Sequence, residues 1–236
     1  MKKSNYLVFF FIKFLFFSAV SFSQKNIEKY FDEVIQAENL PMSNGKLYTN
    51  NYKTTDTYPF YQDAYSKESI SYKNESYDAI NLKYDIFRDV LIFRPYGESE
   101  KFGIELILEN VNSFTLKNKK FVNLSLQINK NYNFIKGYYE ENYKSDKLSF
   151  YIKHIKVNID FIENKQIYKS FQSQNEYLLF TNNNFYKIKD VKEVIKIFPS
   201  LEKEIYQFEE EYSFLLRTNK DEFFEKLIKK ISTLIQ

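Results

Sequence analysis

Apolar and polar residues alternate along much of the stretch from residue 69 to residue 188, and this pattern constrains the fold more than any other feature of the chain. A period of two places successive side chains on opposite faces of an extended strand. Short polar segments interrupt the alternation where the chain could reverse direction. These predicted turns lie at residues 73–75, 85–89, 95–103, 117–119, 144–147 and 181–184.

The segments between the turns are predicted strands. They lie at residues 69–72, 80–84, 90–92, 104–108, 114–116, 121–128, 134–143, 148–157, 177–180 and 185–188. Strands that follow one another closely pair as antiparallel hairpins. We therefore expect a strongly twisted antiparallel sheet of about eight to ten strands, a size at which a sheet can curl into a half-barrel.

Helical periodicity replaces the alternation at both ends of the chain. Residues 25–39 predict an amphipathic helix, because their apolar residues recur at helical spacing. Near the other end, Asp190 with Glu193 and Asn219 with Glu222 have the spacing of helix-capping boxes. These two pairs predict helices in the C-terminal fifty residues.

The order of these elements predicts an α+β fold. Residues 69–188 are strand-rich and residues 189–236 are helical. No linker rich in proline or glycine divides them, so residues 24–236 are expected to form a single domain.

The N-terminus has the pattern of a secretory signal peptide. Lys2 and Lys3 precede an apolar run at residues 6–17, and small residues follow up to Ser23. The run is shorter than the roughly 20 apolar residues of a membrane span. We expect cleavage after Ser23, which would leave Gln24 at the mature N-terminus and no membrane span; an uncleaved anchor is the alternative.

Removal of this leader would make the chain formally neutral. It has 34 Lys and Arg against 31 Asp and Glu, and three of the lysines lie in the leader. A neutral chain has no electrostatic footprint for nucleic acid. The chain also has no cysteine, so it lacks the residue that anchors a lipoprotein and can form no disulfide.

The sequence offers few candidates for catalysis or cofactor binding. Four glycines, at positions 45, 97, 103 and 137, are too dispersed for a phosphate-binding loop, which excludes nucleotide binding by either glycine fingerprint. The single histidine, His154, is the strongest candidate for a general base or metal ligand. It has no second histidine and no serine or cysteine motif beside it, so we expect an exposed strand residue there and no metal site.

Carboxylate pairs are the other candidates, because two converging acids could support a hydrolase. Glu140 and Glu141 are neighbours in a strand and should point to opposite faces. The pairs that could share a face are Glu98 with Glu100 and Asp85 with Asp89, while the acidic run at 202–211 is expected to be a solvated helix face without calcium-loop spacing. We expect no catalytic, cofactor-binding or metal residue among them.

A cluster of tyrosines could line a ligand groove. It comprises Tyr132, Tyr138, Tyr139 and Tyr143. Tyrosines at this density also suit the two faces of strands in a core, and that is the expected role here.

Four segments resemble a class of small exported proteins of Bacteroidota, especially flavobacteria. They are "SFSQ" at the end of the leader, "INLKYDIFRDVLIFRP", "GYYEENYKSDKLSFYIKH" and "NEYLLFTNNNFYKIKDVKEVIKIFPSLEKEIYQF". The resemblance implies an envelope location, either periplasmic or associated with the outer membrane or cell surface. It supplies no catalytic residue.

The sequence thus predicts an exported protein that is not an enzyme and that binds an envelope partner. The alternative is a periplasmic carrier or chaperone of a lipid or other apolar ligand, and the third candidate is a hydrolase that uses paired carboxylates. A filled core with an exposed apolar patch would favour the first, and an enclosed apolar cavity would favour the second.

Overall fold

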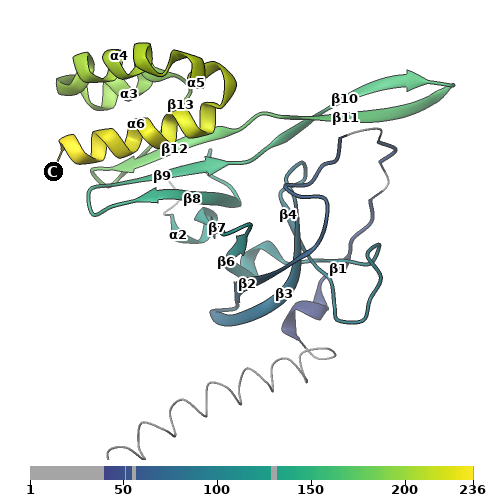
Figure 1. The fold of residues 1–236 in the computed structure, drawn as a ribbon. Helices are drawn as coiled ribbons and strands as arrows, with labels where there is room; N and C mark the ends of the chain where they lie inside the picture. The colour runs from purple at the N-terminus through teal and green to yellow at the C-terminus, as the bar shows by residue number, and fades with distance from the viewer. Residues whose placement is uncertain (1–39, 51, 55–56, 129–131, 236) are drawn as a thin grey trace, which may run out of the picture.

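The computed structural model describes residues 40–50, 52–54, 57–128 and 132–235. Within this part the fold is α+β, as predicted, with a large antiparallel sheet and helices at the C-terminal end (Figure 1). The sheet has eleven strands in the order β1-β5-β4-β3-β2-β6-β7-β8-β9-β12-β13. They are β1 Lys46–Leu47, β2 Ser66–Tyr72, β3 Glu75–Asp85, β4 Val90–Phe93, β5 Ile104–Glu105, β6 Val111–Leu116, β7 Lys119–Asn123, β8 Tyr138–Lys144, β9 Leu148–Lys153, β12 Glu176–Thr181 and β13 Asn184–Ile188.

The sheet stays open, with β1 and β13 as its two edges. It also has more strands than the eight to ten expected. The additional strand is β1 at one edge, which is only two residues long and pairs with β5. Two residues are too few to show a period of two in the sequence.

Asparagine and lysine form the tight turns of four hairpins. In each turn both central residues have positive φ, at 73–74, 117–118, 164–165 and 182–183. Two consecutive left-handed residues give the type I′ turn, whose twist matches that of paired strands. Asparagine tolerates this conformation better than most residues, so these turns form in a chain that has only four glycines. Three of these four turns lie where the sequence predicted them.

The helices follow the sheet in sequence and lie together over β8, β9, β12 and β13 (Figure 1). They are α3 Val191–Ile197, η3 Pro199–Leu201, α4 Glu202–Glu211, α5 Ser213–Thr218 and α6 Lys220–Leu234. Both predicted helix caps form their N-cap bond: the side chain of Asp190 accepts from the backbone N–H of Glu193, and that of Asn219 accepts from the N–H of Glu222. The acidic run on α4 is largely solvated, as predicted.

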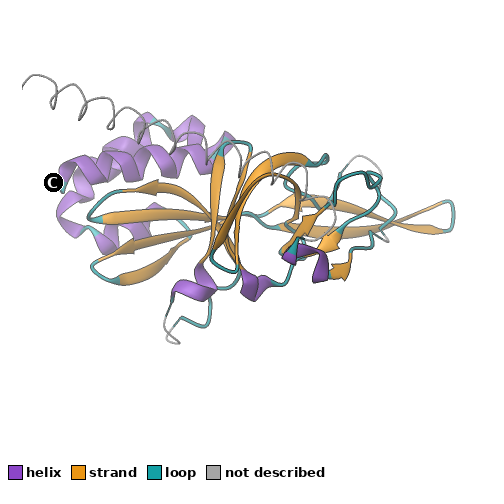
Figure 2. Cartoon of the chain, turned by 90° about the horizontal axis from the view of Figure 1, so that it is seen from below, coloured by secondary structure: helices purple, strands orange, loops and turns teal. Residues whose placement is uncertain are grey.

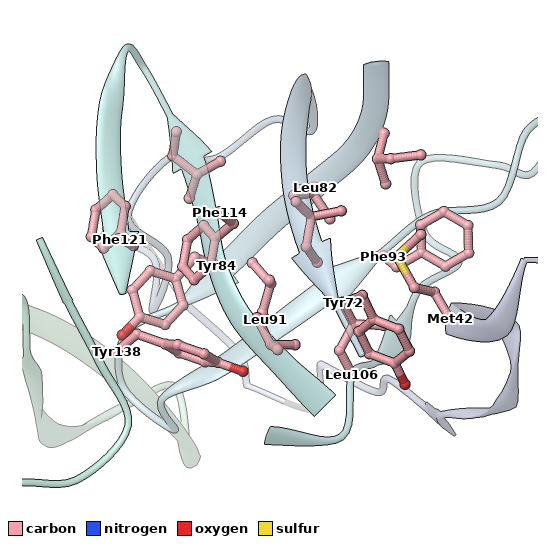
Figure 3. Close-up of a cluster of buried hydrophobic side chains, with 14 of the residues drawn as sticks. Met42, Tyr72, Leu82, Tyr84, Leu91, Phe93, Leu106, Phe114, Phe121 and Tyr138 are labelled. Atoms are coloured by element: carbon pink, nitrogen blue, oxygen red, sulfur yellow. The ribbon is translucent and has the colours of Figure 1, made fainter. Parts of the chain in front are cut away.

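A first set of buried side chains, the N-terminal core, fills the curve of strands β2 to β8. Figure 3 shows its central aromatic residues, where the rings of Phe114 and Phe121 stack at 5.0 Å and Tyr84 meets both edge-on. Tyr138 from β8 completes the group. Aromatic rings bury much apolar surface and prefer such tilted contacts, so they stabilise the curved part of the sheet.

A second set, the C-terminal core, lies between the helices and the adjacent sheet face. Leu148, Phe150 and Ile152 of β9 point toward it, the face that the sequence assigned to them. The helices contribute Val191, Val194, Ile205, Phe208, Phe223, Phe224, Leu227, Ile228 and Ile231. This apolar stripe buries the helices against the sheet and explains why a chain without disulfides can hold them there.

Four predicted strands were wrong over part of their length. The strand predicted at 104–108 ends at Glu105, the one predicted at 134–143 begins only at Tyr138, and those predicted at 121–128 and 148–157 are interrupted. The sequence predicts an extended segment from residue 121 to residue 128, but β7 ends at Asn123 and the helical turn α2 Leu124–Gln127 follows. The buried side chain of Asn123 donates to the carbonyl oxygens of Leu108 and Val111, at 2.8 and 3.0 Å. This long-range contact ends the strand, and local periodicity cannot reveal it.

A second, two-stranded sheet projects from the molecule. It is the hairpin of β10 Lys156–Glu163 and β11 Gln166–Ser173, which continue β9 and β12 beyond the main sheet (Figure 2). This hairpin was not predicted from the sequence over residues 158–173. A strand pattern is nonetheless present in the sequence, since Val157, Ile159 and Phe161 alternate with polar residues.

The predicted leader at 1–23 and the predicted helix at 25–39 lie outside the described residues. Among the helices that the structure describes, none is both long and apolar enough to cross a bilayer.

Replacing Phe224 with alanine is expected to lower the free energy of unfolding by about 3–5 kcal/mol, because it opens a cavity in the C-terminal core. Phe224 is fully buried on α6, and its ring lies 4.9 Å from that of Tyr177. Phe214→Ala on α5 is the matched control, since Phe214 is 73% exposed and its loss should change stability by about 0.5 kcal/mol or less. Chemical denaturation of both variants measures the difference; equal losses would contradict this description of the core.

Candidate functional site

The hairpin β10–β11 leaves the main sheet at a bend made by His154 and Ile155. The sequence predicts one strand from 148 to 157, but β9 ends at Lys153 and β10 begins at Lys156. Across the bend, the N–H of Gln174 donates to the carbonyl of Ile155, and the side chain of Asn175 accepts from the N–H of Ile155. These bonds keep the two chains paired while their direction changes.

His154 is buried, which corrects the expectation of an exposed strand residue. It is 7% exposed, and its ring packs against Tyr61 and Phe121, with centroids 4.9 and 5.8 Å away. Its Nε2 atom lies 2.6 Å from Oε2 of Glu140. The alternation of residues places His154 on the same face as Phe150 and Ile152. It cannot show that Tyr61 and Phe121, from other parts of the chain, cover the ring there.

Glu140 of β8 is the centre of this polar group. Its carboxylate is 2% exposed and accepts hydrogen bonds from the Lys119 ammonium on β7 and the Asn142 amide, besides the contact with His154. Burial alone raises the pKa of Glu140, and the hydrogen bonds from His154, Asn142 and Lys119 outweigh it and lower the pKa to about 2. The carboxylate is therefore ionised at neutral pH and joins β7, β8 and the bend.

Glu141 points away from Glu140, as predicted for neighbours in a strand. It pairs instead with Lys120 and Lys144 on the other face of the sheet. The two carboxylates thus do not form a pair that could act on one substrate.

The other carboxylate pairs are also separated by their own partners. Asp85 is fully buried, where it binds Tyr48 and the guanidinium of Arg88 and caps the turn through the N–H groups of Phe87 and Arg88. Asp89, in the same turn, binds Tyr84 and Lys153. Each carboxylate of this pair is neutralised by a different base, which is an arrangement typical of structural ion pairs.

Glu98 and Glu100 lie in the exposed loop before β5. Glu100 pairs with Arg94. Within the described residues, no three His, Cys, Asp or Glu side chains are grouped so that they could hold a metal ion.

The tyrosine cluster divides between cores instead of lining one groove. Tyr138 packs in the N-terminal core, while Tyr139 packs on the opposite face with Val122, Tyr151 and Leu178. Tyr132 lies beside this second group and Tyr143 beside the C-terminal core. The expected packing role is therefore the one observed.

A cavity of about 850 Å³ opens near the end of α6. The β8–β9 and β12–β13 turns line it together with Phe198 and Ile235, and they contribute the charged side chains of Lys144, Asp146 and Lys147. The cavity is open to solvent and its lining mixes charged and apolar side chains, unlike the enclosed apolar site that a lipid requires.

The projecting hairpin carries exposed apolar side chains along its length. Val157 and Ile159 are exposed on one face, where Phe161 stacks on Tyr168. Near the tip, Ile162 and Ile167 lie opposite each other and are 77% and 62% exposed. Isolated exposed apolar residues are ordinary, whereas a group of them on a projecting element makes the hairpin a candidate interaction surface.

Among the described residues, the β11 edge of the hairpin has bonded partners, and the β10 edge has one only at its start; this edge beyond Lys156 is called the free edge. On β11, the N–H of Lys169 donates to the carbonyl of Lys53 and the N–H of Phe171 to the hydroxyl of Thr57. On β10, the N–H of Lys156 donates to the carbonyl of Ile86. Beyond it, the register and the tight turn point the backbone groups of Asn158, Asp160 and Ile162 outward, where the described residues offer them no partner.

Comparisons with known proteins add no relative: no family model, curated protein or solved structure matches the chain.

The Glu140 network predicts a specific loss of stability in acid. A carboxylate whose pKa is lower in the folded than in the unfolded state stabilises the fold above its unfolded pKa, and this contribution disappears as the pH falls toward the folded value. For Glu140 the window runs from 4.5 down to about 2, and the loss should be on the order of 3 kcal/mol. Denaturant titrations across this window measure it.

Glu140→Gln should lack this component, since a neutral amide does not titrate there. Glu163→Gln, at the exposed hairpin tip, should keep the wild-type dependence. An unchanged pH profile in Glu140→Gln would contradict the assignment of the buried charge.

Proposed function

We propose that this protein is exported to the cell envelope and acts without catalysis, by binding an extended segment of a partner protein along the free edge of β10. The observation that carries the proposal is the projecting hairpin, which combines outward backbone groups with apolar side chains. A strand added to a sheet edge gains main-chain hydrogen bonds from the edge and specificity from the side chains on either face. The hairpin offers both.

The geometry of the edge supports a partner strand in particular. Asn158, Asp160 and Ile162 direct their backbone groups outward over one stretch of β10. The apolar residues Ile159 and Phe161 alternate with them, so an added strand with apolar residues at every second position would extend the apolar face. A long exposed edge of this kind is usually blocked by charge or a bulge. The charged residues of β10 are Lys156 at its start, Asp160 in its middle and Glu163 at the tip, and the charge of Asp160 is offset by its ion pair with Lys169 of β11.

The other two candidate functions have less support. A carrier of apolar ligands needs an enclosed apolar cavity, whereas the cavity near α6 is open and has charged residues in its lining. A carboxylate hydrolase needs two acids that converge, whereas Glu140, Asp85 and Asp89 are each bonded to their own base.

A photo-crosslinking residue placed at position 162 tests the proposal. The labelled protein is irradiated in envelope preparations from its own cells, and linked peptides are sequenced. We expect one partner, linked through an extended segment with alternating apolar residues. The same label at position 214, which is exposed on α5, is the control and should give no such product.

Ile159→Asp should weaken this binding about tenfold or more, because it places a charge on the apolar face of the complex. The substitution lies on an exposed strand position and should leave stability within about 0.5 kcal/mol. Products linked only to a second copy of the chain, products equal at positions 162 and 214, or binding unaffected by Ile159→Asp would each overturn the proposal.

Export is tested separately. Protein recovered from the envelope fraction should begin at Gln24, as the signal-peptide pattern predicts. Recovery from the cytoplasm with Met1 in place would contradict it.

A further inference from the structure

A partly buried ion pair links the end of β9 to the β3–β4 turn, with the side chain of Lys153 10% exposed and that of Asp89 28% exposed. Nζ of Lys153, the last residue of β9, lies 2.5 Å from Oδ2 of Asp89, in the turn between β3 and β4. The ammonium also donates to the carbonyl of Lys136 at 2.9 Å. The two residues are 64 positions apart in the chain, so the pair connects distant parts of the fold.

Lys153 differs from the other ion-paired lysines of the described residues in its burial. Its side chain is 10% exposed, while the lysines of the remaining pairs range from 26% to 66%. Burial lowers the pKa of Lys153, with the nearby Asp89 opposing the shift. A desolvated lysine of this kind is more readily available as the neutral amine, which is the nucleophilic form.

Tyrosines surround the pair. The hydroxyl of Tyr84 donates to Oδ1 of Asp89 at 2.5 Å, and the ring of Tyr139 lies 5.1 Å from Nζ of Lys153. The buried hydroxyl of Tyr138 has no hydrogen-bond partner within the described residues. One oxygen of Asp89 is thus held by a tyrosine and the other by the amine.

Gly137 makes room for this arrangement. Its φ is +69°, and a Cβ atom there would lie 1.9 Å from Oδ2 of Asp89 and 3.0 Å from Nζ of Lys153. A residue with a side chain would therefore both strain the backbone and displace the pair. The backbone at position 137 can lie this close to the Asp89 carboxylate and the Lys153 ammonium because the residue is glycine.

We propose that Lys153 and Asp89 condense to form an amide that links β9 covalently to the β3–β4 turn. A proton passes from the ammonium to Oδ2, and the lone pair of Nζ attacks Cγ of Asp89. The bond from Tyr84 stabilises the charge that develops on Oδ1. Nitrogen then gives up a second proton, and Oδ2 leaves as water. One ammonium and one carboxylate yield one amide and one water, so no further reactant is needed.

Tryptic digestion of the unfolded full-length protein tests this proposal directly. If the amide forms, residues 89–101 and 148–156 appear as one linked peptide whose mass is the sum of the two less one water, because trypsin does not cut at a modified lysine or between Arg94 and Pro95. If it does not form, trypsin cuts after Lys153 and the peptides 89–101 and 148–153 are recovered separately. Complete recovery of the separate peptides from folded wild-type protein overturns the proposal.

Three variants identify the groups involved. Lys153→Arg keeps the positive charge but cannot form the amide, so the linked peptide should be absent. Lys119→Arg, in the more exposed pair with Glu140, should retain it. Tyr84→Phe should slow its appearance in freshly folded protein, and an unchanged rate would overturn the role given to Tyr84. The wild-type digest decides the main question even if a variant fails to fold.

Discussion

The buried carboxylate of Glu140 is the interaction on which the arrangement of the molecule depends. An ionised group that has left water must be bonded on every side, and the loss of one partner leaves a charge that the interior cannot solvate. Glu140 meets this requirement with a lysine from β7, an amide from its own strand and the histidine of the bend. These three partners fix the point at which the sheet passes from the N-terminal core to the C-terminal core.

The bend at His154 determines where the hairpin β10–β11 points. Because β9 and β12 turn out of the sheet while remaining paired, the hairpin they continue into projects beyond both cores (Figure 1). Lys53, Thr54 and Thr57 contact β11 on one side of it, and on the other side the β3–β4 turn bonds only to Lys156, at the start of β10. Beyond Lys156, the backbone groups of Asn158, Asp160 and Ile162 point outward and have no partner in the part of the chain that the structure describes. The hydrogen bonds of Glu140 hold the bend at His154, and the bend sets the direction of the hairpin. The buried network therefore orients the edge of β10 that is proposed to bind a partner.

Much of the fold could be predicted because it follows from local patterns. Turn residues such as Asn74 and Asn183, the caps at Asp190 and Asn219, and the faces of β9 all depend on neighbours in the sequence. The features that were missed depend on contacts between distant residues. Asn123 ends β7 through bonds to residues more than ten positions away, and His154 is buried by Tyr61 and Phe121 from other parts of the chain.

Amide hydrogen exchange along β10 in the purified protein tests the free edge most directly. The register predicts slow exchange at Ile159 and Phe161, whose N–H groups point toward β11, and fast exchange at Asn158, Asp160 and Ile162. Slow exchange at all five positions would show that the edge is already covered. Fast exchange at all five would show that the hairpin is not formed, and either result would contradict the account.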